Sequence, residues 1–100
     1  MAAEKTYIEG VTPNGVHFSI DGKMLNDIRV IKALSEVKEK QDNDLMGATA
    51  ATFKLCKLLF GSDVGVDRFI DSIAEVHDGC PPDVFINELK AVLEKVNAKN

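Results

Sequence analysis

Three residues near position 80 could together form a site for thiol or metal chemistry. His77, Asp78 and Cys80 are close in sequence, and a cysteine at a helix N-terminus can have a lowered pKa that makes it a nucleophile. Catalysis by such a thiol also needs a base and a third, orienting group, and a structural zinc site needs four ligands. Because the segment offers only part of either set, we interpret it as a helix-end histidine, an Asp-Gly turn and a loop cysteine.

Other residues of chemical interest lack the neighbours that their chemistry needs. Cys56 lies between Phe53 and Phe60 in a helical stripe, where free cysteine usually packs in the core. No glycine is followed by the Gly-Lys-Ser/Thr ending of a phosphate loop, and the acidic pair Asp42 and Asp44 lacks the other ligands of a calcium loop. The sequence therefore predicts no catalytic residue, no cofactor and no metal site.

Length and charge narrow the class of protein. One hundred residues, 45% of them hydrophobic, fit one domain over 1–100. The net charge is -4 and no block of Lys and Arg stands apart, which argues against partners such as nucleic acid or an anionic membrane. No secretory leader is visible, and the longest charge-poor run is too short to span a membrane. Two cysteines without framework spacing are typical of a reducing cytoplasm.

Residues 6–21 have the pattern of a β-hairpin. Val16, Phe18 and Ile20 alternate with polar residues, as in a half-buried strand. The segment Thr12-Pro13-Asn14-Gly15 supplies turn residues. Since an isolated hairpin is only marginally stable in water, this one must rest on the remainder of the chain.

After residue 22 the apolar residues recur every three or four positions instead of every two, and four helices are expected over 26–97. The first runs over about 26–40 with Asn26 as N-cap, and the second over 45–60 until Gly61. The third opens at 62–63 and stops at 78–79, and the fourth begins at the prolines 81–82. Three of these helices carry an apolar stripe that is expected to face the core. The stripe of the first helix is Leu25, Ile28, Ile31, Leu34 and Val37, and that of the third is Val66, Phe69, Ile70 and Ile73. The stripe of the fourth is Phe85, Ile86, Leu89, Val92, Leu93 and Val96. The predicted fold is mainly α, a small bundle of about four helices preceded by an N-terminal hairpin.

The second helix is apolar nearly all round. Between residues 45 and 60 only Lys54 and Lys57 are charged. Such a helix is either central in the bundle or covered by a partner, and the two interpretations are compatible. The candidate partner-binding residues are Leu45, Met46, Ala48, Ala51 and Phe53. A glutamate at position 48 or 51 is expected to reduce self-association or partner binding if that position is exposed.

The order of parts resembles a known family. A strand ending in Asp21-Gly22 precedes the helix that starts with Asn26-Asp27. The second helix ends in Leu58-Leu59-Phe60-Gly61. The segment His77-Asp78-Gly79 precedes the prolines of the last helix. This order is similar, from about residue 18 to 96, to the tail assembly chaperones of long-tailed, non-contractile bacteriophages. Their sequences typically show a D-W-x-x-L-x-x-L helix, an L-L-x-x-L-L-G helix end and a D-G-x-V-P step. Here Ile28-Arg29 stands where the family often has tryptophan.

The resemblance implies a function in tail assembly. Chaperones of this family act as oligomers, bind the long helical tape measure protein and keep its apolar segments soluble until tail tube protein replaces them. They work in the host cell cytoplasm and are not retained in the mature virion. Two alternatives stay open: a small structural or adaptor phage protein without a chaperone role, and a thiol-dependent enzyme that uses Cys80 with His77.

The family also suggests a prediction about the gene. Its members are often made in two lengths, the longer one by a backward ribosomal slip on a heptamer such as A-AAA-AAC. The residues Ala98-Lys99-Asn100 are compatible with that heptamer. We predict the codons GCA-AAA-AAC or GCA-AAA-AAT here, with an open minus-one frame, and the nucleotide sequence checks this directly. An AAG codon for Lys99, or a minus-one frame that closes within a few codons, would contradict it.

Overall fold

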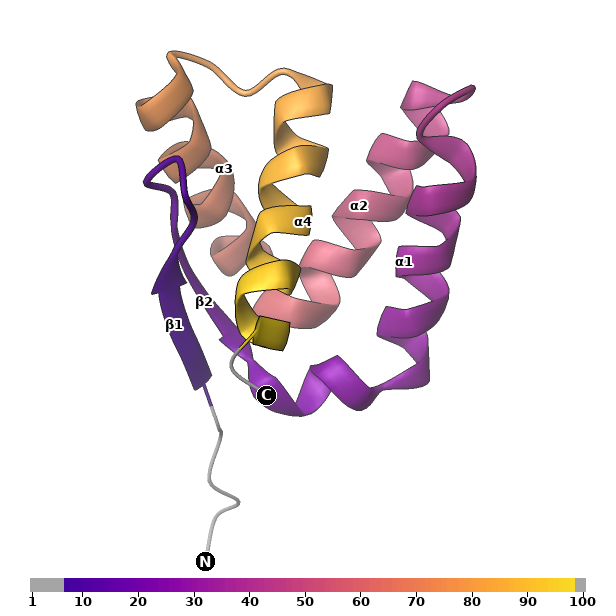
Figure 1. Cartoon of the computed structure of the whole chain (residues 1–100), viewed down its shortest axis with the longest axis horizontal. Coiled ribbons are helices and arrows are strands. Elements are labelled where there is room, and N and C mark those ends of the chain that lie inside the picture. The colour runs from indigo at the N-terminus through magenta and orange to yellow at the C-terminus, as the bar shows by residue number, and fades with distance from the viewer. Residues whose placement is uncertain (1–6, 99–100) are drawn as a thin grey trace, which may run out of the picture.

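The predicted architecture is confirmed by a computed structural model, which describes residues 7–98. Two antiparallel strands are followed by a short 3-10 helix and four α-helices (Figure 1). In chain order these are β1 (Tyr7–Val11), β2 (His17–Asp21), η1 (Gly22–Asn26), α1 (Ile28–Lys40), α2 (Leu45–Phe60), α3 (Asp63–His77) and α4 (Pro82–Ala98). None of the helices between Tyr7 and Ala98 has both the length and the apolar character needed to cross a membrane.

The hairpin closes on the predicted turn residues. Gly15 N–H donates to the Thr12 carbonyl at 2.9 Å, and Gly15 has a φ of 95°, a conformation that glycine adopts without a Cβ penalty. Strand pairing sets Phe18 opposite Gly10 and Ile20 opposite Ile8. The alternation places Val16, Phe18 and Ile20 in the core and leaves the side chain of His17 exposed, as predicted.

Most helix boundaries follow from local capping chemistry. The side chains of Asp44 and Ser62 accept hydrogen bonds from backbone N–H groups in the first turns of α2 and α3. Gly61 ends α2 in the left-handed region with a φ of 80°. The start of α1 was predicted one residue too early, because Asp27 rather than Asn26 is the N-cap and accepts from Arg29 N–H at 2.8 Å.

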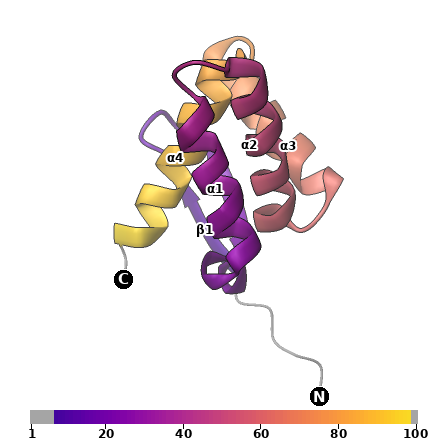
Figure 2. The same cartoon turned by 90° about the vertical axis from the view of Figure 1, so that its right-hand side faces the viewer.

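Helix α2 is central in the bundle. It contacts α1, α3, α4 and β2, and in Figure 1 it lies between α1 and α4. The helices α1 and α2 run side by side, and in the perpendicular view α2 lies between α1 and α3 (Figure 2). The buried residues of α2 are Ala48, Ala51, Thr52, Leu55, Cys56 and Leu59. The structure therefore confirms that α2 is the central helix, and it leaves the other side of this helix facing water.

The core face of α1 differs from the prediction. Ile28 is 72% exposed and Ile31 is also exposed, whereas Val30 and Ala33, which were not predicted, are buried. Val37 is buried as predicted, and Leu25 and Leu34 are partly buried against the core. The three- and four-residue spacing fits both sets, and the choice depends on how α1 lies against α2, which periodicity does not specify. The predicted stripes of α3 and α4 are confirmed, with Ile70 half-buried at the margin.

Candidate functional site

The structure divides the five candidate partner-binding residues into two groups. Leu45 and Phe53 are each 46% exposed and Met46 is 82% exposed, so these three are accessible. Ala48 and Ala51 are 0% and 3% exposed. They cluster with Val37 of α1 and Ile86 of α4 in a small core of four residues. A glutamate at 48 or 51 would therefore disrupt folding, and neither alanine can meet a partner in this conformation.

An exposed apolar surface remains on the first half of α2, which we call the α2 patch: Leu45, Met46, Ala50 and Phe53. Met46, Ala50 and Phe53 recur at four- and three-residue spacing on one side of the helix, away from its buried residues, and Leu45 adjoins Met46 at the helix start. The ring of Phe53 packs on Phe85 of α4, with centroids 4.9 Å apart and the planes tilted by 40°. This contact anchors the exposed ring of Phe53 against the bundle.

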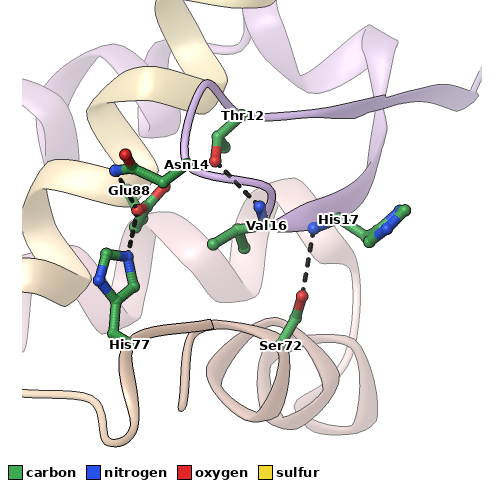
Figure 3. A network of polar contacts seen from close by, with 7 residues as sticks. All are labelled: Thr12, Asn14, Val16, His17, Ser72, His77 and Glu88. Carbon is green, nitrogen blue, oxygen red and sulfur yellow. Dashed lines mark hydrogen bonds and ion pairs between the residues drawn. The ribbon is translucent and has the colours of Figure 1, made fainter. Parts of the chain in front are cut away.

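The second candidate site is a buried carboxylate that the sequence analysis did not identify. Glu88 of α4 is only 2% exposed. One of its oxygens, Oε2, lies 2.6 Å from His77 Nε2 at the end of α3 and accepts from Asn14 Nδ2 in the hairpin turn at 2.8 Å (Figure 3). These contacts join three segments that are far apart in the sequence.

The surroundings of Glu88 keep it ionised. Burial by itself raises the pKa of this carboxyl, but hydrogen bonds from Asn14, His77 and Thr12, together with the charge of His77, outweigh burial and lower the pKa below its ordinary value of 4.5. The bonded oxygen, Oε2, holds its donors firmly, because a donor that leaves would expose an unpaired charge in the core, whereas Oε1 is buried without a hydrogen-bond partner. The cluster therefore fixes the hairpin turn against α3 and α4.

The same geometry argues against the thiol chemistry considered for His77 and Cys80. His77 Nε2 is occupied by Glu88, and among the described residues no hydroxyl or thiol bonds to its other ring nitrogen. Burial raises the pKa of the Cys80 thiol. The pKa of the Cys56 thiol is raised mainly by burial and to a smaller extent by the nearby Cys80. Both thiols are therefore poor nucleophiles at neutral pH.

A cleft of about 690 Å³ opens between the hairpin and the first half of α3. Its lining includes Glu9, Arg68 and Ser72, so it carries charges of both signs. The N–H of His17, on the edge of β2, donates to Ser72 Oγ at 3.1 Å (Figure 3). This hydrogen bond closes part of the strand edge against α3, which protects it from pairing with another chain.

Comparison with protein-family models, with curated proteins and with solved structures finds no match to this chain. Within residues 7–98, no three His, Cys, Asp or Glu side chains come together as they would to hold a metal ion. The functional interpretation therefore rests on the α2 patch and on the resemblance in sequence.

One signal in the sequence could have revealed the Glu88 cluster. Glu88 falls within the apolar stripe of α4, three residues after Phe85 and directly before Leu89. A carboxylate on the core face of a helix must be paired, so its position alone predicts a buried partner. The identity of that partner could not be predicted, because His77 and Asn14 belong to other elements.

The first prediction from this site concerns Glu88. We expect Glu88→Gln to lower the free energy of unfolding at neutral pH by about 1–3 kcal/mol, because the amide cannot accept as well from both His77 and Asn14. The folded pKa of Glu88 lies below its unfolded value, so its stabilisation is complete above pH 4.5 and is lost as the pH falls through the folded pKa. Urea denaturation measured between neutral and acidic pH checks both statements.

A matched control separates this effect from other acids. The pKa of Asp27 is lowered to about 2 by its hydrogen bonds with Arg29, so Asp27 contributes acid sensitivity in the unmodified protein and in Glu88→Gln alike. The exposed Glu94, on the same helix, should tolerate Glu94→Gln without loss of stability. If Glu88→Gln and the unmodified protein gave parallel stability curves down to acidic pH, the carboxylate would not act as described.

The two thiols give a second prediction. Cys56→Ala should cost about 1–2 kcal/mol through lost packing, since Cys56 is completely buried. Cys80→Ser should change stability by less than about 0.5 kcal/mol and leave partner binding intact. Thermal unfolding and a binding assay measure both. A loss of binding or of any activity in Cys80→Ser, in a folded protein, would reverse the interpretation of this loop.

Proposed function

We propose that this protein is a tail assembly chaperone that binds the tape measure protein through the α2 patch. The observation that carries the proposal is the exposure of Leu45, Met46 and Phe53 on a helix whose first half has no charged side chain. Contiguous exposed apolar side chains are typical of a surface that meets another protein. The chaperone acts as an oligomer in the host cell cytoplasm and leaves before the virion matures.

The chemistry of the patch suits a long helical client. Phe53 offers a rigid ring held by Phe85, whereas Met46 has three rotatable bonds and a polarisable sulfur that adapts to different apolar surfaces. Ala50 is small and lets a helix backbone come close. A repeated client with many apolar segments needs such adaptable contacts more than it needs one specific fit.

Co-expression with the tape measure protein tests the proposal. We expect the protein to keep the tape measure protein in the soluble fraction and to be captured with it. Met46→Glu should weaken this binding about tenfold or more, because covering an unpaired carboxylate costs more than about 1.4 kcal/mol. Position 46 is 82% exposed, so the variant should fold.

The control is Ser35→Glu, which adds the same charge at an exposed position of α1 outside the patch. It should bind and solubilise as the unmodified protein does. If the unmodified protein self-associates but does not solubilise the tape measure protein, the adaptor alternative is favoured. If Met46→Glu solubilises it fully, the patch is not the binding surface.

A further inference from the structure

A groove with an apolar floor and a basic rim lies between α1 and α2. Its volume is about 340 Å³, and its apolar lining residues are Ala33 and Leu58, which we call the floor. The charged residues that line it are four cations and one acid, namely Arg29, Lys32, Lys54, Lys57 and Glu36. In a chain whose net charge is -4, this is a local excess of positive charge.

Two of the four cations are already engaged within the molecule. Arg29 pairs with Asp27 at 2.8 Å, and Lys57 lies 3.5 Å from Asp63. Lys32 and Lys54 have no acidic partner within ion-pair distance in the described part of the chain, 7–98. They are therefore the cations most available to a partner that enters the groove.

The complementary surface is present on the same chain. Asp67, Asp71 and Glu75 are exposed and recur every four residues, so they form one acidic stripe along α3. Val64, 61% exposed, lies on the same side and offers an apolar contact, and Arg68 is the one cation on this side. Like charges four residues apart on a helix repel each other, and a cationic partner surface relieves that repulsion.

We propose that the α1–α2 groove binds the acidic stripe of α3 from a second copy of this chain. The helices α3 and α1 lie on opposite sides of the molecule (Figure 1), and among the described ion pairs only Asp63, before the stripe, joins α3 to a residue of the groove, Lys57. A helix laid against two adjacent antiparallel helices packs as in a bundle, with its apolar side chain toward the floor and its carboxylates at the cationic rim. The inference rests on the self-association proposed above and is independent of which client the α2 patch binds.

Charge reversal tests this contact. In the groove variant, Lys32→Glu and Lys54→Glu reverse the charge of two groove residues. In the stripe variant, Asp67→Lys and Asp71→Lys reverse the charge of two stripe residues. All four positions are exposed, and circular dichroism and thermal unfolding verify that both variants fold. Sedimentation velocity over a concentration series at low salt should show that each variant alone associates at least about tenfold more weakly than the unmodified protein.

The two variants should restore each other. In an equimolar mixture the acidic groove of the groove variant can bind the basic stripe of the stripe variant. The unmodified groove of the stripe variant can bind the unmodified stripe of the groove variant, so association returns. A single chain that carries all four substitutions should recover it too. Lys38→Glu with Lys95→Glu, which has the same net charge as the groove variant but leaves groove and stripe intact, should associate normally. Association of the unmodified protein should weaken in about 1 M salt, where the Debye length is about 3 Å.

The remaining outcomes would overturn the inference. A protein that stays monomeric at low salt has no such contact, and reversed variants that associate like the unmodified protein use another surface. Weakening in both variants without recovery in the mixture would mean that the groove does not bind the α3 stripe. Loss of tape measure binding alone in the groove variant would assign the groove to the client. Solubilisation of the tape measure protein is measured separately, so its failure is distinguishable from failure of this contact.

Discussion

The division of α2 into a buried and an exposed side constrains the rest of the molecule. On the buried side, Ala48 and Ala51 are small, and they let α1 and α4 approach the first half of α2 closely. The second half uses Leu55 and Leu59, which fill the wider space where α3 and β2 also converge. Because the inner side of the first half takes only small residues, its large apolar side chains, Met46 and Phe53, lie outside. The same packing requirement that builds the bundle thus leaves an apolar surface on it.

A second constraint is electrostatic and acts on the hairpin. Two strands alone do not bury enough surface to be stable, and β1–β2 depends on the helices for support. Apolar packing of Phe18 and Ile20 supplies one part of that support, and the Glu88 carboxylate supplies a directional part at the turn. A buried hydrogen-bonded charge adds little net stability compared with an apolar residue of the same shape, but it penalises every arrangement in which its donors are displaced. Glu88 therefore contributes mainly to the position of the hairpin relative to α3 and α4.

Local chemistry made much of this fold predictable. Ser62, Gly61 and the prolines before α4 act on backbone groups within a few residues, so helix boundaries could be inferred without knowledge of the tertiary structure. Strand alternation predicted the inward face of β2 for the same reason. What failed depends on contacts between elements. Ile28 and Val30 are both plausible core residues until α1 is placed against α2, and Ala48 was a plausible surface residue until α1 and α4 were known to cover it.

The candidate surfaces gain meaning from their relative position on α2. The outward side of this helix is apolar at Met46 and Phe53 and becomes basic at Lys54 and Lys57, which also line the groove. Copies joined through the groove and the α3 stripe would each present one α2 patch beside that contact. One patch is too small to bind an apolar helix tightly by itself, but several patches held in one assembly bind a long chain with a high effective concentration. Under the proposed function, weak individual contacts would also let the client be released one segment at a time. A small domain with a modest apolar surface can thus hold a client far longer than itself, provided that its copies associate through a different surface from the one that binds the client.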